Sequence, residues 1–226
     1  MNNLTLIIPS KKESESLPIF LKELENINCI KLIVLENEDI NTENSIKKIE
    51  NIKILKQKNP GYGRAIIEGI NNTETDYCCI INADGSMDPK YLSEMLKLCT
   101  DGNDLIFGSR YLRPGGGSED DTFITLIGNK FFSLLGNILY KLKISDILYT
   151  YILGKTSSFK SLELKNYDFR LCVEIPIKAK KFHLKYKDIA SFERSRIAGK
   201  KKVNAFKDGF LILIEMLNLF FWYKKK

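Results

Sequence analysis

Short apolar runs recur along the first half of the chain, at residues 4–9, 31–36, 52–57, 77–82 and 104–109. Continuous apolar runs of this length are typical of strands that are buried on both faces of a sheet. Between them, apolar residues follow helical spacing around residues 17–24, over 62–70 and from Pro89 onwards. Strands that alternate with helices predict a mostly parallel, Rossmann-like sheet with flanking helices, which is an α/β fold class.

The pattern changes after Arg110. The glycine-rich, acidic stretch RPGGGSEDD, residues 113–121, predicts a mobile loop. A long helical stretch follows from Ile124 to Leu142, and then an irregular segment, a helix near 168–181 and a strand in YKDIASFER. We expect this second half to cover the carboxyl edge of the sheet and to recognise a second substrate.

The longest apolar segment is FKDGFLILIEMLNLFFWY, residues 206–223. A central acid, Glu215, argues against a membrane span, because an acid at that depth costs about 2.5–3.5 kcal/mol on insertion scales. In a helix Asp208, Glu215 and Asn218 form one polar stripe, so residues 206–226 predict a C-terminal amphipathic helix. Such a helix either lies on a membrane surface or packs against the core, and the sequence leaves both open.

Composition narrows the class of protein. The 226 residues are 44% hydrophobic, enough for one compact domain with a C-terminal appendage. Lysine and arginine outnumber the acids by 35 to 28, with clusters at SRIAGKKK and YKKK, which suits an anionic partner or a solvated basic face. Nucleic acid is not expected, because the clusters lack interleaved aromatic residues and no known binding motif is present.

Five cysteines without a CxxC pair indicate neither a disulfide framework nor a zinc site, and they suit a reducing compartment. The first twenty residues lack the pattern of a secretion signal, so we expect a cytoplasmic protein.

Polar residues gather where the predicted strands end, in PSKKE, ENED, NADGS and GSR. Ligands of open parallel sheets bind outside the carboxyl ends of the strands, so these loops can face one crevice. Within NADGS, Asn82 and Asp84 are candidates to hold Mg²⁺ or Mn²⁺, which accept one or two protein carboxylates beside substrate phosphates. The alternative for Asp84 is an ordinary Asx turn.

A second candidate is NPGYGRAIIEG, residues 59–69. Gly61 and Gly63 precede a helix, so the backbone can approach a ligand closely and the helix amides can face an anion. Arg64 is a candidate phosphate partner, although an exposed arginine is the commoner case.

Taken together, these stretches resemble family 2 glycosyltransferases, in particular the branch of dolichyl and polyprenyl phosphate mannose synthases. The resemblance runs through LTLIIPSKKESESLPIFLKEL, IVLENED, NPGYGRAIIEGI, DYCCIINADGSMDP, DLIFGSRY, IGNKFFSLLGNILYKLKISD and ERSRIAGKKKV, over about residues 3–205. It implies a GT-A fold, a nucleotide-diphosphate sugar donor, a divalent metal (Mg²⁺ or Mn²⁺) and inversion at the anomeric carbon.

The resemblance also implies roles for particular residues. Asn82 and Asp84 stand at the first and last positions of the family's DxD motif, and Asp84 would be the metal ligand. The other residues of the nucleotide-sugar site would be Pro9, Glu13, Glu36, Asn37, Gly61, Gly63, Arg64 and Gly85. The cations that face donor or acceptor phosphate would be Arg110, Arg196 and Lys202.

Two acids are candidate catalytic residues. Asp146 matches the residue that deprotonates an acceptor hydroxyl in many relatives, but a lipid phosphate acceptor needs no base, and a plain turn residue is the alternative. Glu174 also matches a family position, where a structural role is at least as good an interpretation. The branch usually follows its SD with a short segment of the TSGFR type, whereas this chain has ILYTYILGKTSSFK, so the expected arginine is missing and Lys155 is only a possible substitute.

We therefore expect a metal-dependent inverting hexosyltransferase of cell-envelope glycan synthesis that uses a donor of the GDP-mannose or UDP-glucose type. Its acceptor would be a polyprenyl phosphate or a lipid-linked glycan, and the protein would be peripheral on the inner face of the cytoplasmic membrane. Residues 1–110 would bind the nucleotide sugar, residues 111–205 the acceptor and residues 206–226 the membrane surface. The rival hypothesis is a non-catalytic nucleotide-sugar or membrane-binding module with the same fold.

Overall fold

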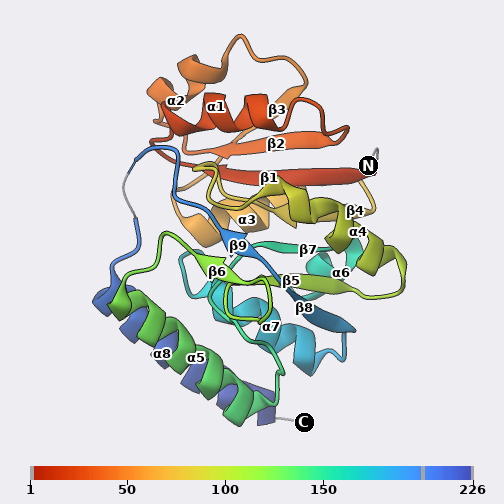
Figure 1. The fold of residues 1–226 in the computed structure, drawn as a ribbon, viewed down its shortest axis with the longest axis vertical. Coiled ribbons are helices and arrows are strands. Elements are labelled where there is room, and N and C mark those ends of the chain that lie inside the picture. Colours follow the sequence, from red (N-terminus) through yellow and green to blue (C-terminus); the bar gives the residue numbers. More distant parts are fainter. Residues whose placement is uncertain (1–2, 200–201, 225–226) are drawn as a thin grey trace.

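A computed structural model of the chain describes residues 3–199 and 202–224. Lys200, Lys201, Lys225 and Lys226, which belong to the two basic clusters, lie outside the described residues. A seven-stranded sheet with strand order β3-β2-β1-β4-β7-β5-β8 forms the centre, and β6 and β9 form a second, two-stranded sheet (Figure 1). The predicted fold class is confirmed.

The first half follows the predicted alternation of strands and helices. Its strands are β1 (Leu4–Ser10), β2 (Ile30–Leu35), β3 (Ile52–Lys56), β4 (Tyr77–Ile80) and β5 (Leu105–Ser109). Its helices are α1 (Ser16–Glu23), α2 (Ile40–Ile46), α3 (Tyr62–Asn71), a 3₁₀ turn at Pro89–Tyr91 and α4 (Leu92–Thr100). Strand β1 pairs in parallel with β2 and β4, so the ends of these strands meet at one edge of the sheet.

The second half also contributes strands to the main sheet, which the sequence pattern did not predict in full. Strand β7 (Ile152–Lys155), in the segment expected to be irregular, runs antiparallel to both β4 and β5. Strand β8 (Tyr186–Ala190) pairs in parallel with β5 and ends the sheet. The expected single strand in YKDIASFER breaks at Ser191, and β9 (Phe192–Glu193) pairs instead with β6 (Gly117–Ser118) inside the predicted loop.

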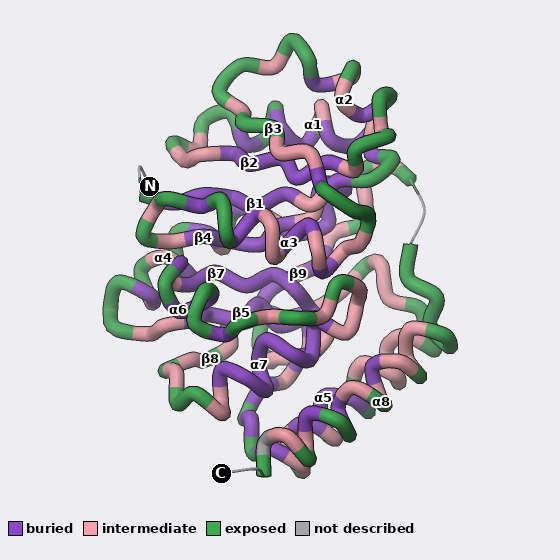
Figure 2. The backbone as a smooth tube through the Cα atoms, turned by 180° about the vertical axis from the view of Figure 1, so that it is seen from behind, coloured by how far each residue is buried: buried purple, intermediate pink, exposed green. Residues whose placement is uncertain are grey.

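Alternating side chains of the sheet feed two hydrophobic cores. Ile7 of β1 and Cys78 of β4 face a core shared with α3, α6 (Thr156–Ser161) and α7 (Leu171–Lys181). Leu6 and Cys79 face the other core, which α1 and α4 cover. Because side chains alternate along a strand, fully apolar runs are needed where helices cover both faces (Figure 2). All five cysteines are free, and burial raises the pKa of the Cys78 thiol to about 12.

Two long helices lie side by side below the sheet (Figures 1 and 2). Helix α5 (Phe123–Tyr140) begins with a capping box formed by Thr122 and Thr125. Helix α8 (Ala205–Lys224) is the predicted C-terminal helix, and it packs on α5 and α7. By length and composition alone α5 could cross a membrane, with a mean hydropathy of 1.3 and 22% of the helix buried.

Candidate active site

A cavity of about 610 Å³ opens at the carboxyl edge of the sheet. Its walls come from the segments after β1, β3, β4 and β5, from the start of α3, from residues 120–129 and 148–150, and from Glu193, Arg196, Lys202 and Val203 beyond β8. We name residues 193–199 the strap. This volume lies in the range of small-molecule sites, and the place is where parallel sheets bind ligands. Of the predicted residues, the cavity is lined by Pro9, Glu13, Gly61, Asn82, Asp84, Arg110, Arg196 and Lys202.

Asp84 is both a turn residue and a cavity residue. Its Oδ1 accepts hydrogen bonds from the Ser86 amide at 3.1 Å and the Ser86 hydroxyl at 2.8 Å, which is the Asx turn. Its Oδ2 lies 3.4 Å from Nη1 of Arg196. Gly85 has a positive φ of 74°, and a Cβ there would lie 2.4 Å from the Ile197 side chain. The turn therefore fixes one carboxylate oxygen and leaves the other facing a cation.

Asn82 belongs to a polar network at the floor of the cavity. Its Oδ1 accepts a hydrogen bond from the Tyr62 hydroxyl at 3.0 Å, and the same hydroxyl lies 2.6 Å from Thr150 Oγ1. Burial raises the pKa of Tyr62, so this hydroxyl keeps its proton. Tyr62 also stacks on Phe169, with ring centroids 4.9 Å apart. Asn82 is thus oriented by α3 and by the segment before β7.

Within the described residues, no group of three or more histidine, cysteine or acidic side chains is placed to hold a metal ion. A single carboxylate nevertheless fits Mg²⁺ or Mn²⁺ when substrate phosphates and water supply the other oxygen ligands. Asp84 offers that carboxylate inside the cavity, and Asn82 offers an amide oxygen beside it. These residues fit the expected metal, with Arg196 as the cation that now neutralises Asp84.

The residues expected around the nucleoside divide into two groups. Glu13 lies in the cavity wall, accepts a hydrogen bond from Ser16 at 2.6 Å and pairs with Lys202. Glu36 and Asn37 follow β2 but are not among the lining residues, and Glu36 pairs with Lys11 at 2.8 Å. The sequence predicted that all of these residues lie at one edge of the sheet. Glu36 and Asn37 follow β2, however, which is one strand further from the cavity than β1.

Gly61, the N-cap of α3, and Gly63, in its first turn, approach this chain's own backbone. A Cβ on Gly61 would lie 2.4 Å from the Tyr167 carbonyl oxygen, and one on Gly63 would lie 2.3 Å from that of Asn166. Arg64 donates its amide to the Tyr167 carbonyl at 3.1 Å, and its guanidinium lies 3.7 Å from the centroid of that ring. Packing against residues 166–168 therefore explains the glycines, and Arg64 does not line the cavity.

Glu174 holds the same segment from behind. Its carboxylate accepts hydrogen bonds from the amides of Lys165 and Asn166, both at 2.9 Å, and pairs with Lys178 at 2.7 Å. The side chain is 1% exposed and does not line the cavity. This placement gives Glu174 a structural role, because it fixes the backbone of the segment that packs against the start of α3.

Arg110 lies at the centre of a group of carboxylates. Its Nε and Nη2 donate to Asp146 at 2.7 and 3.0 Å, and its Nη1 lies 3.2 Å from Glu193 and 3.7 Å from Asp121. The guanidinium also lies 4.6 Å from the centroid of the Tyr149 ring. Burial alone would lower the pKa of Arg110, but the ion pair with Asp146 raises it well above its ordinary value.

Asp146 is placed differently from what a catalytic base needs. Both of its carboxylate oxygens accept from Arg110, one of them also from the Arg110 amide at 3.2 Å. It is 1% exposed and lies behind Arg110, outside the set of lining residues. The geometry gives it the role of holding Arg110.

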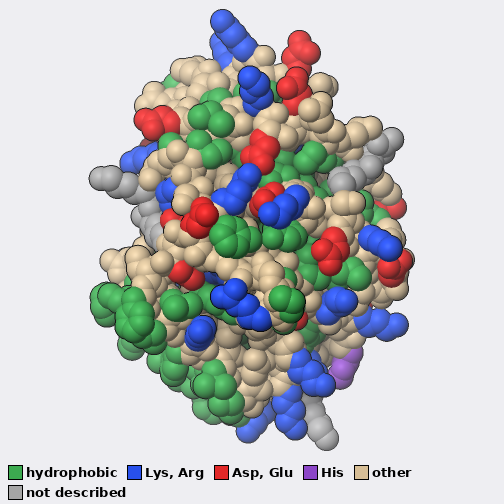
Figure 3. Space-filling view, viewed as in Figure 1, with side chains coloured by type: hydrophobic (Ala, Val, Ile, Leu, Met, Phe, Trp, Pro, Cys, Tyr) green, Lys and Arg blue, Asp and Glu red, His purple; other side chains and the backbone are tan. Residues whose placement is uncertain are grey.

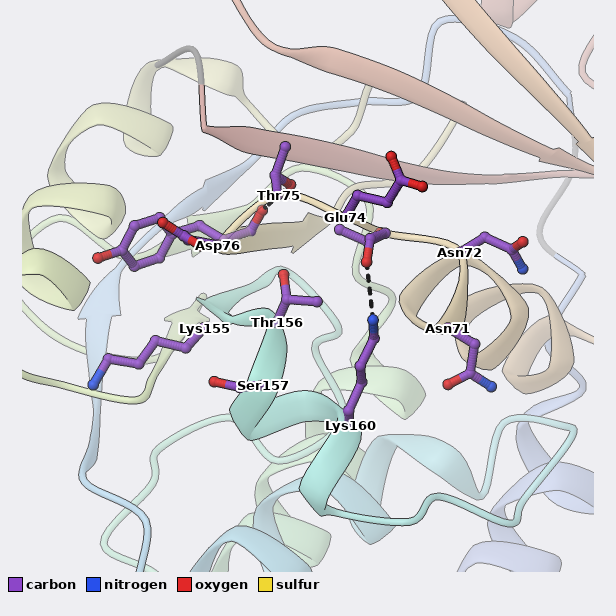
Figure 4. A pocket seen from close by; sticks show the side chains of 11 residues that line it. Asn71, Asn72, Glu74, Thr75, Asp76, Lys155, Thr156, Ser157 and Lys160 are labelled. Carbon is purple, nitrogen blue, oxygen red and sulfur yellow. Dashed lines mark hydrogen bonds between the residues drawn. The ribbon is translucent and has the colours of Figure 1, made fainter.

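Lys155 lies away from the other predicted residues, at the opposite end of β7. It pairs with Asp104 at 2.8 Å and lines a separate cavity of about 760 Å³ with residues 71–77 (Figure 4). Because β7 is antiparallel to β4, its last residue lies beside Tyr77 at the start of that strand. The antiparallel direction, which the sequence did not reveal, separates Lys155 from the active-site edge.

Three acids that line the cavity were not predicted from the sequence, namely Asp120, Asp121 and Glu193. Asp120 and Asp121 belong to the stretch expected to be a mobile loop, and Glu193 stands directly before the basic residues of RSRIAGKKK. In the sequence they are visible only as acids, because SEDD belongs to the expected loop and Glu193 to the expected strand YKDIASFER, and neither pattern indicates a ligand site.

Comparison with known proteins now identifies the family. The model of Glycosyl transferase family 2 matches residues 5–163. The chain belongs to this family. An uncharacterised glycosyltransferase of Mycobacterium tuberculosis is 27% identical over 143 residues, which cover 63% of this chain and 63% of the relative. Dolichol-phosphate mannosyltransferase of Pyrococcus furiosus is 24% identical over 186 residues, which cover 78% of this chain and 53% of the relative. The chain thus matches little more than half the length of these relatives.

Solved structures show the same GT-A fold. Glucosyl-3-phosphoglycerate synthase of Mycobacterium tuberculosis, in complex with Mn²⁺, UDP and phosphoglyceric acid, superposes with a TM-score of 0.71 at 12% identity, over 97% of this chain and 78% of that one. Residues 1–349 of TarS from S. aureus give a TM-score of 0.58 at 13% identity, over 96% of this chain and 66% of that one. At these identities the likeness establishes the fold alone.

Proposed function

We propose that this family 2 member is a metal-dependent inverting glycosyltransferase that moves a hexose from a nucleotide-diphosphate sugar, of the GDP-mannose or UDP-glucose type, to a lipid-linked acceptor. The acceptor would be a polyprenyl phosphate or a lipid-linked glycan of the cell envelope. The observation that carries this proposal is Asp84 at the end of β4, with one carboxylate oxygen facing a cavity at the carboxyl edge of the sheet. Glucosyl-3-phosphoglycerate synthase, whose solved structure holds Mn²⁺ and UDP, has the same fold, which supports the donor class.

The chain's own residues would bind the donor around this carboxylate. Lys11, Lys12, Arg196 and Lys202 line the cavity and would face the diphosphate. A divalent metal on Asp84 would neutralise the charge that grows on the leaving nucleoside diphosphate. Arg196, which now pairs with Asp84 and also with Asp120 at 3.0 Å, would turn to the phosphates once that carboxylate is occupied.

The molecule also has a face suited to an anionic membrane. Exposed apolar side chains gather over the two lower helices (Figure 3), and we name this surface the α5–α8 face. It consists of Phe123, Ile124, Ile127, Phe131, Leu134 and Ile138 on α5, and Phe206, Phe210, Ile214, Leu217 and Phe221 on α8. A contiguous exposed patch of this kind marks an interaction site, and peripheral helices bind bilayers through such apolar surfaces.

The charges around the α5–α8 face complement an anionic bilayer. Lys130, Lys207 and Lys224 are exposed on the two helices, and each lysine near an anionic surface contributes about 1 kcal/mol. Glu215 points inward and accepts a hydrogen bond from Asn166 at 3.0 Å. Ile212 and Met216 are buried, so α8 packs on the domain with one side and presents apolar residues on the other. We propose that this face rests on the cytoplasmic surface of the membrane.

Donor binding tests the proposal directly. Titration calorimetry with UDP-glucose and GDP-mannose, with and without Mn²⁺, should show Mn²⁺-dependent binding of one of them. Asp84→Asn keeps a side-chain acceptor for Ser86 but loses the charge, so Mn²⁺-dependent affinity should fall at least tenfold. Asp88→Asn is the matched control, because Asp88 caps the neighbouring 3₁₀ turn and does not line the cavity. Wild-type protein that binds neither donor with Mn²⁺ would refute the proposal.

One observation favours the non-catalytic alternative. The ion pair between Arg196 and Asp84 neutralises the carboxylate without a metal, as a module that only binds nucleotide sugars would allow. The same preparation separates the two, because binding without any release of nucleoside diphosphate would support the alternative.

A further inference from the structure

The side of the cavity around Arg110 is acidic. Asp120, Asp121 and Glu193 line it, and we name these three residues the acidic wall. Asp146 adds a fourth carboxylate behind them. Asp121, Asp146 and Glu193 all lie near Arg110, and Asp120 pairs with Arg196. Three carboxylates, those of Asp121, Asp146 and Glu193, therefore surround the single guanidinium group of Arg110.

Arg110 is poorly placed to bind an acceptor phosphate. Each of its three guanidinium nitrogens already lies within hydrogen-bond distance of a carboxylate of Asp146 or Glu193. A phosphate would have to displace these carboxylates and then remain beside them, and like charges at such distances repel strongly in a partly buried site. An uncharged sugar hydroxyl meets no such penalty, because a carboxylate is a good hydrogen-bond acceptor for it.

Glu193 has a carboxylate oxygen left for a substrate. Its Oε2 accepts from Ser118 at 2.5 Å and lies 3.2 Å from Arg110 Nη1, while its Oε1 has no hydrogen-bond partner among residues 3–199 and 202–224. Asp121 differs, because both of its oxygens already accept hydrogen bonds: Oδ2 from Tyr111, and Oδ1 from Thr125 and Asn129. Glu193 therefore combines a fixed carboxylate with one oxygen available in the cavity.

The backbone brings Glu193 close to the loop that carries Asp84. Strand β9 pairs with β6 on one side, and Glu193 forms a β-bridge with Met87 on the other. The Arg194 amide donates to the Ser86 carbonyl at 2.9 Å, and the Ile197 amide donates to the Asp84 carbonyl at 2.9 Å. These contacts tie the strap to the NADGS loop, so the acidic wall and Asp84 form two sides of one cavity.

From this arrangement we infer that the acceptor is a neutral glycan hydroxyl and that Glu193 is its catalytic base; the inference rests on the proposed donor and reaction. Glu193 Oε1 would take the proton of the acceptor hydroxyl as that oxygen forms its bond to the anomeric carbon. The bond from the anomeric carbon to the diphosphate oxygen breaks, and the nucleoside diphosphate leaves with the electron pair. Of the two acceptor classes proposed above, this selects the lipid-linked glycan.

The electrostatics agree with this role. Burial raises the pKa of Glu193 above its ordinary value, although Arg110 and Ser118 oppose that effect. The titratable and charged groups that face it are Arg110 after β5, Asp121 before α5 and Tyr149 before β7. A carboxylate with a raised pKa is a stronger base than an exposed one, which suits proton transfer near neutral pH.

A pair of short lipids tests the acceptor class. Wild-type protein with Mn²⁺ and the donor identified by calorimetry is given either octyl β-glucoside, which offers hydroxyls, or farnesyl phosphate. We expect transfer to octyl β-glucoside and at least tenfold less to farnesyl phosphate. Preferential transfer to farnesyl phosphate would overturn the inference, and so would transfer to neither lipid by protein that binds the donor. Protein that binds no donor would instead refute the proposed function.

Substitution tests the base. Glu193→Gln should lower kcat for octyl β-glucoside by about 10²–10⁴-fold with little change in donor affinity. Because the base must be deprotonated, wild-type kcat should rise with pH through the raised pKa of Glu193, and the variant should lose that rise. Asp121→Asn is the matched control: it removes a charge from the same wall, and because Asp121 helps to raise the pKa of Glu193, the rise in kcat should move to lower pH but remain. Full kcat in Glu193→Gln, or an unchanged pH profile, would overturn the assignment.

Discussion

The ion pair between Arg110 and Asp146 offers a sharp test of how the site is held together. Replacing Arg110 with methionine keeps much of the apolar volume but leaves Asp146, with a side chain 0% exposed, without its cation. Removing one partner of a buried pair destabilises by about 3–5 kcal/mol, because the other charge stays buried and unpaired. We expect a loss of this size in the free energy of unfolding at pH 7.

Urea unfolding followed by far-ultraviolet circular dichroism measures that loss. The double variant Arg110→Met/Asp146→Leu should recover part of the stability, since it removes both charges. Arg170→Met is the matched control: its partner Asp168 has a side chain 43% exposed, so the loss should stay below about 1 kcal/mol. Equal losses in Arg110→Met and Arg170→Met would refute the reasoning.

Two further predictions concern packing and membrane binding. Gly63→Ala should lower the free energy of unfolding, measured in urea, by about 1–3 kcal/mol, because its Cβ would lie 2.3 Å from the Asn166 carbonyl oxygen. Gly128→Ala is the matched control: it has open space around it and should raise the free energy of unfolding by about 0.5–1 kcal/mol. Phe210→Asp should weaken binding to phosphatidylglycerol vesicles at least tenfold in co-sedimentation. Ile40→Asp should leave vesicle binding unchanged, because Ile40 is an exposed residue of α2 at the far end of the molecule. Equal stability of the two alanine variants, or vesicle binding unaffected by Phe210→Asp, would contradict these expectations.

Much of the fold could be predicted because the local pattern and the global architecture agree. Each parallel strand is buried on both faces, so its run of apolar residues is visible without any knowledge of its neighbours. Strand β7 could not be predicted in this way, because its four residues follow an irregular stretch and carry no sign of direction. Its antiparallel pairing is decided by contacts with β4 and β5, and it moved Lys155 to the opposite end of the sheet.

The candidate site was predictable where one loop carries the chemistry. The Asn82 and Asp84 pair lies where the end of a buried strand must place it, and the cavity there was expected. The roles of Arg110, Asp146 and Glu174 depend on which groups pack against them, so a residue-by-residue likeness to relatives could not distinguish a phosphate ligand from the partner of a carboxylate. Glu193 could not be recognised for the same reason, since no local pattern indicates that β9 pairs with β6.

The sequence by itself determined the α/β architecture, the edge of the sheet at which the cavity lies and the family, because periodicity and strand-end loops are local properties. Tertiary structure alone decided which charges meet. It placed Arg196 on Asp84, surrounded Arg110 with carboxylates and turned Glu215 inward beneath an apolar surface. Electrostatic interactions fall off with distance and depend on burial, so the acidic character of the wall around Arg110 becomes visible only after residues far apart in the sequence, such as Arg110 and Glu193, are brought together.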